Sequence, residues 1–96
     1  MTITEDQLKA AHKHSSKNKI EITDSEICGC FCCLKIFEPK EIMLWYDQTK
    51  AEFVSNPESD DCTAICPFCG TDSVISSASD HTITSNFLKE MQTFWF

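Results

Sequence analysis

Apolar side chains recur at helical spacing in the last part of the chain. Five of them would share one broad face of a helix: Phe87, Leu88, Met91, Phe94 and Trp95. Thr84 precedes this pattern, where its hydroxyl can accept a hydrogen bond from a backbone N–H of the first turn. The pattern predicts a helix over residues 85–96. Most of its apolar face should belong to the core, but a small domain has little area under which to bury so many rings, so these C-terminal aromatics are also a candidate homodimer surface.

A thinner amphipathic pattern at the start predicts an N-terminal helix over residues 1–19, separate from a second unit over residues 20–96. Thr4, followed three residues later by Gln7, fits a capping box. The main apolar positions are Ile3, Leu8 and Ala11. We expect a solvated helix that lies loosely on the domain, with docking on another molecule as the alternative.

Short apolar-rich segments predict the strands. They cover residues 20–23, 34–37, 42–47, 63–65 and 73–76, although residues 42–47 are also compatible with a short helix. Pro39 can open a single helical turn, because its missing N–H would be unsatisfied there. Residues 56–61 are acidic and rich in turn formers, and residues 77–81 are polar, so both predict loops. The expected fold class is α+β, with short antiparallel strands between helices at both ends.

Two cysteine pairs lie at the spacing of zinc knuckles. Cys66 and Cys69 form one C-x2-C pair and are followed by Gly70, and Cys30 and Cys33 form another, giving C-x2-C-x32-C-x2-C. Tetrahedral zinc takes four thiolates, and a set of four leaves no open position for a substrate. We therefore predict one structural Zn²⁺ on these four cysteines. Binding at such a site contributes on the order of 10 kcal/mol to folding, so the metal-free chain should be largely unfolded.

The other thiols leave alternatives open. Cys28 and Cys32 crowd the first pair and could replace one of its ligands, whereas Cys62 is expected to pack or to lie in a loop. A redox or nucleophilic role for one of these cysteines would need exposure near a histidine such as His81. Surface positions are expected for the three histidines: His12, His14 and His81. Asp72 is expected to be a turn residue at the exit of the second pair.

The charge balance bears on partners and location. Fifteen acidic residues against eight basic ones give a formal charge of −7, and all eight basic residues are lysine. Phosphate and guanine recognition favours clustered lysine with arginine, so nucleic acid is an unlikely partner and another protein, including a basic one, fits better. The odd number of cysteines, the absence of an apolar leader and the absence of an apolar run of roughly 20 residues favour a cytoplasmic protein that does not cross a membrane.

Several segments carry a family resemblance. They are residues 28–37 (CGCFCCLKIF), Pro39, Glu41 and Ile42 with Trp45, residues 63–75 (TAICPFCGTDSVI), and residues 87–91 (FLKEM) with 95–96 (WF). Together these segments resemble a group of small bacterial cytoplasmic proteins without an established activity, and the two knuckles are similar to zinc ribbons. The resemblance implies the metal and the location and leaves the function open.

The sequence therefore predicts a zinc ribbon-like protein-interaction module, such as an adaptor, an immunity-type protein or an anti-defence protein, without catalytic activity. A nucleic-acid-binding zinc ribbon is the first alternative, and it requires the lysines to gather on one face. A thiol-dependent enzyme is the second, weaker alternative.

Overall fold

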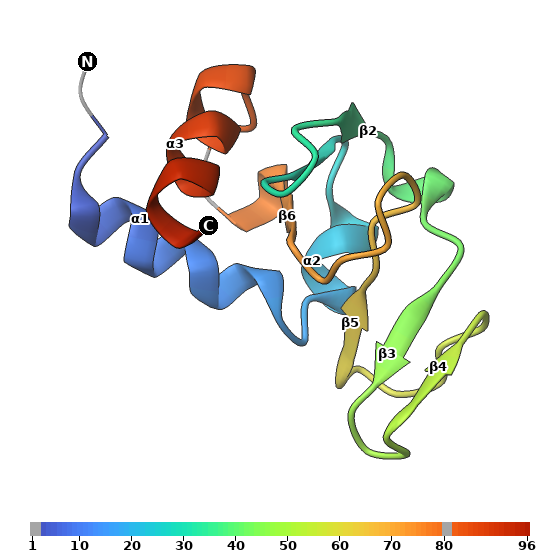
Figure 1. Cartoon of the computed structure of the whole chain (residues 1–96). Coiled ribbons are helices and arrows are strands. Elements are labelled where there is room, and N and C mark those ends of the chain that lie inside the picture. Colours follow the sequence, from blue (N-terminus) through green and yellow to red (C-terminus); the bar gives the residue numbers. More distant parts are fainter. Residues whose placement is uncertain (1–2, 80–81) are drawn as a thin grey trace.

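The computed structural model describes residues 3–79 and 82–96. Within them the chain forms three α-helices, three short 3-10 helices and six strands, in an order that puts helices at both ends (Figure 1). The helices are α1 (Glu5–His12), η1 (Lys13–Ser15), α2 (Lys19–Asp24), η2 (Pro39–Glu41), η3 (Ser77–Ser79) and α3 (Ser85–Trp95). The strands are β1 (Cys28–Cys30), β2 (Ile36–Phe37), β3 (Trp45–Asp47), β4 (Glu52–Val54), β5 (Cys62–Ala64) and β6 (Val74–Ser76). The predicted α+β class, with antiparallel strands and terminal helices, is confirmed.

The strands form two small antiparallel sheets. Sheet A has the order β2-β1-β6, and sheet B has the order β4-β3-β5. The chain passes from sheet B to sheet A between β5 and β6, through the second cysteine pair. Each sheet has three strands, and neither has much area of its own. Most of their stability must therefore come from the elements packed on them.

The two terminal helices pack against each other and against sheet A (Figure 1). They share one core cluster of eight buried residues: Leu8, Ala11, Phe31, Ile75, Ile83, Phe87, Leu88 and Met91. Trp95 of α3 donates a hydrogen bond from its indole N–H to the backbone carbonyl of Leu8 at 3.3 Å. The expectation of a loosely attached, solvated N-terminal helix was wrong, because Leu8 and Ala11 are buried beneath α3.

Close contact between α3 and sheet A depends on Gly29 in the central strand β1. A β-carbon at this position would lie 2.8 Å from side-chain atoms of both Ile83 and Leu88. Both of those residues are buried and have little room to move. A glycine in the middle of this strand therefore lets the helix approach the sheet.

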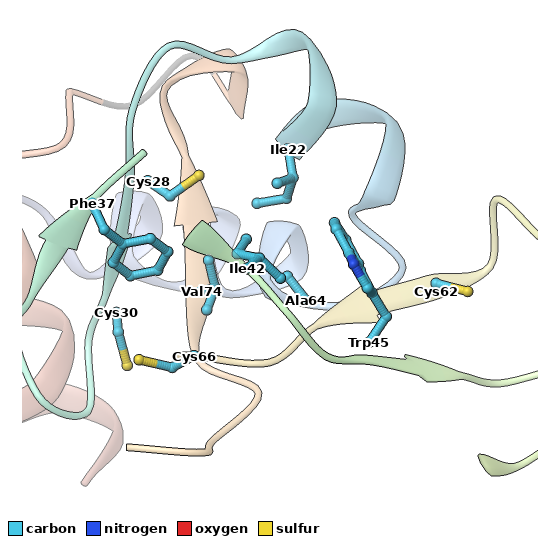
Figure 2. Close-up of a cluster of buried hydrophobic side chains, with 10 residues drawn as sticks. All are labelled: Ile22, Cys28, Cys30, Phe37, Ile42, Trp45, Cys62, Ala64, Cys66 and Val74. Atoms are coloured by element: carbon cyan, nitrogen blue, oxygen red, sulfur yellow. The ribbon is translucent and has the colours of Figure 1, made fainter. Parts of the chain in front are cut away.

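A second core cluster fills the space between sheet A, sheet B and α2. Its ten members are labelled in Figure 2: Ile22, Cys28, Cys30, Phe37, Ile42, Trp45, Cys62, Ala64, Cys66 and Val74. Four of the seven cysteines belong to this cluster, and all four are almost fully buried. Trp45 is the largest of these side chains and comes from β3 of sheet B, so it fastens that sheet to the rest of the domain.

Asn18 is a buried polar residue that joins the two sheets. Its Nδ2 donates to the backbone carbonyl of Val74 in sheet A at 2.9 Å and to that of His14 at 2.9 Å. Its Oδ1 accepts from the backbone N–H of Ala64 in sheet B at 3.0 Å. The side chain is 2% exposed, so these bonds satisfy groups that water does not reach.

Three predicted elements differ from the structure. Residues 20–23 belong to helix α2 and not to a strand. The strands predicted over residues 34–37 and 42–47 are shorter, and only β2 and β3 remain of them. Strand β4 was not predicted at all, and its residues lie outside the loop predicted over residues 56–61.

The helix caps were predicted correctly, although the N-terminal helix predicted up to residue 19 ends at His12 and is followed by η1. Thr4 and Gln7 form the capping box of α1, with hydrogen bonds of 3.2 and 2.9 Å. The hydroxyl of Thr84 accepts the backbone N–H of Phe87 at 3.1 Å at the start of α3. Pro39 opens the single 3-10 turn η2.

Candidate metal centre

The structure brings the four predicted cysteines together at one end of the second core cluster. The Sγ atoms of Cys30, Cys33, Cys66 and Cys69 all lie within 4.8 Å of one another. The distance is 3.6 Å between Cys30 and Cys69 and 3.7 Å between Cys33 and Cys66. Four sulfurs held at about 2.3 Å around a tetrahedral metal lie about 3.8 Å apart, so this cluster has the size of a four-thiolate metal site.

Each cysteine pair lies in a tight loop that follows a buried segment of the chain. Cys30 ends β1, and Cys66 comes two residues after β5. In each loop the first sulfur accepts a backbone N–H from two residues further on. Cys32 donates to Cys30 Sγ and Phe68 donates to Cys66 Sγ, both at 3.4 Å. The two loops therefore present their sulfurs through the same local geometry.

The same equivalence holds where the chain leaves each loop. The backbone N–H of Leu34 donates to the carbonyl of Cys30 at 2.9 Å, and that of Gly70 donates to the carbonyl of Cys66 at 3.0 Å. Leu34 has φ of 65° and Gly70 has φ of 79°, so both adopt the left-handed conformation. Glycine takes this conformation freely, whereas a leucine there costs roughly 1–2 kcal/mol. Leu34 offsets that cost by packing its partly buried side chain against the core cluster that α1 and α3 share.

Burial and hydrogen bonding act on the thiols in opposite directions. Burial raises the pKa of Cys30 to about 11, and burial also raises the pKa of Cys33 and of Cys66. Burial raises the pKa of Cys69 too, but hydrogen bonds from the Thr71 hydroxyl and backbone N–H and from neighbouring thiols outweigh it and lower that pKa to about 6. Among the four thiols of the cluster, the exposed Cys69 is therefore the one whose thiolate form is stabilised.

Thr71 is the site residue that sequence reasoning missed. Its Oγ1 lies 3.1 Å from Cys69 Sγ and 3.6 Å from Cys30 Sγ, so one hydroxyl contacts a sulfur from each loop. Such a contact can donate to a thiolate and hold it in place beside a metal. The sequence offered one indication of this contact, because Thr71 lies only two residues after the last cysteine of the site.

The site lies at the edge of the core. Cys30 and Cys66 are buried, Cys33 is half-buried and Cys69 is exposed. In Figure 2 the sulfurs of Cys30 and Cys66 turn toward each other, whereas the Cys62 sulfur points away from them. A metal in this cluster would be held from the inside by the core and would be reached from the side of Cys69.

The three other thiols lie outside the cluster. Cys28 and Cys62 are fully buried, and Cys32 is half-buried. Burial raises the pKa of Cys28 to about 11, although a hydrogen-bonding contact with Ser25 Oγ at 3.7 Å lowers it slightly. Burial and the negative charge of Asp47 raise the pKa of Cys62. Neither Cys28 nor Cys62 has the exposure or the low pKa of a reactive thiol.

The described histidines make specific contacts away from the cysteines. His12 is exposed, and its ring lies against that of Trp95 with centroids 4.1 Å apart and an interplanar angle of 33°. His14 is half-buried, and its Nδ1 lies 2.7 Å from a carboxylate oxygen of Glu21. His81 lies outside the described residues. Asp72 is exposed at the exit of the second loop, as expected.

Comparison with protein-family models, with curated proteins and with solved structures found no match to this chain. The resemblance to small bacterial cytoplasmic proteins therefore gains no support from these comparisons. The metal centre is supported by the geometry of the four cysteines alone. Within residues 3–79 and 82–96, no helix combines the length and the apolar character needed to cross a membrane.

Proposed function

We propose that this chain is a small protein-interaction module folded around one structural zinc ion, without catalytic activity, in an adaptor, immunity-type or anti-defence role in the cytoplasm. The observation that carries the proposal is the cluster of four cysteine sulfurs within 4.8 Å. An all-thiolate site is typical of zinc, and four protein ligands leave no position for a substrate or a reacting water. The ion would therefore supply folding free energy and no chemistry.

A role in protein interaction is favoured by the apolar side chains that the fold leaves uncovered. Five bulky ones are more than half exposed: Ile20, Met43, Phe53, Phe68 and Phe96. They lie on several elements of a domain with a formal charge of −7. A contiguous exposed apolar patch is typical of a binding surface, whereas single exposed apolar side chains are ordinary, and the negative charge favours a basic partner. A homodimer through Trp95 and Phe96 is the second arrangement that this surface supports.

The nucleic-acid alternative receives little support from the lysines. Four of the eight are paired with carboxylates: Lys9 with Glu5, Lys19 with Asp60, Lys40 with Glu38, and Lys50 with Glu58. These four lysines belong to four different parts of the chain, and each has a carboxylate beside it. A gel shift at low salt tests this alternative, and a salt-dependent shift would favour it.

Metal analysis of protein purified without added zinc tests the proposal. One zinc per chain, with unfolding on chelation, is the expected result. A pull-down from host lysate with the zinc-loaded protein, compared with an unfolded Cys66→Ser control, should capture a defined partner only with the former. Folded protein with less than half a metal per chain would refute the zinc-folded module. Light scattering on the same sample distinguishes a heteromeric partner from self-association.

A further inference from the structure

The outer face of sheet B forms a pocket with the exit of the second cysteine loop. In sheet B, Tyr46 pairs with both Phe53 and Thr63, so these three side chains project on the same side of the sheet. The opposite side carries Trp45 and Ala64, which are buried in the core. The segment from Gly70 to Asp72 forms one wall, and the resulting pocket has a volume of about 410 Å³.

Two aromatic rings line one part of this pocket. The rings of Tyr46 and Phe53 meet edge to face, with centroids 5.1 Å apart and an interplanar angle of 67°. Phe53 is 61% exposed, so its ring is accessible to a ligand. Ring faces presented in this way attract cations, because the π-electrons make them negative.

The charge of the pocket is negative, like the faces of the two aromatic rings. Asp72 is exposed and is the only charged side chain among the described residues that line it. Two lysines near sheet B are paired, since Lys50 Nζ lies 3.7 Å from Glu58 and Lys19 Nζ lies 3.8 Å from Asp60. An incoming cation would therefore meet aromatic faces, a carboxylate and the polar Gln48 and Thr71, and none of the described residues that line the pocket is a lysine.

We propose that this pocket binds an arginine side chain from a basic segment of a partner protein. The guanidinium would stack on Phe53 and Tyr46 and donate to Asp72, while its aliphatic stem would lie along Ile65 and Phe53. Arginine suits this combination better than lysine, because its planar guanidinium stacks on rings and can bond a carboxylate with two N–H groups. The proposal rests on the proposed interaction function and names the surface and the chemistry of the partner.

The test is an NMR titration of zinc-loaded, ¹⁵N-labelled protein with a short arginine-rich peptide at low salt. A peptide with citrulline in place of arginine is the matched ligand, because citrulline has the same shape without the charge. We expect shifts centred on Tyr46, Phe53 and Asp72, and a large loss of affinity for the citrulline peptide. Equal binding of the two peptides would overturn the proposal.

Substitutions distinguish binding in this pocket from a general attraction of the basic peptide to an acidic protein. Phe53→Ala and Asp72→Asn should each weaken binding about two- to fivefold. Phe68→Ala and Asp6→Asn are the controls, because they remove an exposed ring and an exposed carboxylate outside the pocket. Equal losses in test and control variants would mean that the peptide is attracted only by overall charge, and would refute the site.

The two proposals fail in different ways. A zinc-loaded, folded protein that ignores the arginine peptide refutes the pocket and leaves the interaction module standing. A folded protein without metal refutes the zinc-folded module, whether or not the peptide binds. Metal content and the amide spectrum are therefore measured on every sample before the titration.

Discussion

Substitution of Asn18 by alanine should remove the polar link between the two sheets. The substitution deletes the partner of the Ala64 N–H and of the Val74 carbonyl, and both residues are completely buried. A buried backbone group left without a hydrogen bond costs about 1–3 kcal/mol. The two groups together predict a loss of about 2–6 kcal/mol. A domain of this length has a free energy of unfolding of about 5–14 kcal/mol, so the loss is a large fraction of the total.

Urea unfolding at a fixed free zinc concentration measures this loss, because bound metal otherwise shifts the transition. With an m-value near 1.5 kcal/mol per M, the midpoint should fall by about 1–4 M. Asn56→Ala is the matched control, since Asn56 is exposed between β4 and β5, and it should change stability by less than about 0.5 kcal/mol.

The reasoning fails if Asn18→Ala is as stable as Asn56→Ala. Hydrogen exchange on the unmodified protein provides a second measurement that does not require the variant to fold. The Ala64 amide should exchange among the slowest in the chain. Rapid exchange of that amide would show that the bond to Asn18 is not maintained in solution.

Three further predictions concern the cysteines and glycines. Cys66→Ser should abolish stoichiometric metal binding and the fold, as seen by metal analysis and circular dichroism. The control Cys62→Ser should still hold one metal per chain, and loss of the metal from both variants would refute the assigned ligand set. Gly29→Ala should lower the free energy of unfolding by about 1–3 kcal/mol, because the added carbon overpacks against α3. Gly70→Ala should lower it by about 1 kcal/mol through its left-handed backbone alone, because nothing lies within 4 Å of the added carbon. A larger loss for Gly70→Ala than for Gly29→Ala in urea unfolding would contradict this packing. In zinc-loaded protein an alkylating reagent should modify Cys32 and spare Cys62, as counted by mass spectrometry; rapid modification of Cys62 would disprove its burial.

The features predicted correctly from sequence depend on local spacing. A pair of cysteines three positions apart forms a knuckle through its own backbone, and Thr84 caps α3 through a residue three positions away. Such interactions need no knowledge of the rest of the fold. The joining of the two pairs was also predictable, since a four-ligand site requires it.

The wrong strand over residues 20–23 has a geometric cause. Ile20 is 57% exposed and Ile22 is 1% exposed, which matches the alternation expected of a strand. Residues two apart also lie on nearly opposite sides of a helix, about 200° around its axis. Over four residues the two periods cannot be distinguished, and the packing of Ile22 into the second core cluster decides for the helix.

Other features were beyond sequence reasoning because they depend on distant contacts. Asn18 bonds residues 46 and 56 positions away, and no local pattern marks it as buried. Strand β4 exists because it pairs with β3 through a turn in which Asp47 Oδ1 accepts the N–H groups of Thr49 and Lys50 at 2.9 and 3.1 Å. Asp47 was predicted correctly at the end of a strand, but neither its burial nor the turn that it caps was predicted.

The metal centre joins two parts of the chain that a single backbone cut would separate. Cys30 and Cys33 precede the exposed stretch around residues 56–61, and Cys66 and Cys69 follow it. A cut in that stretch would give two fragments, each with two ligands and an unpaired part of both sheets. Neither fragment could complete a tetrahedral site or a core alone. Their reassembly would require the metal, so the nicked protein would behave as a two-part complex that zinc assembles and a chelator separates.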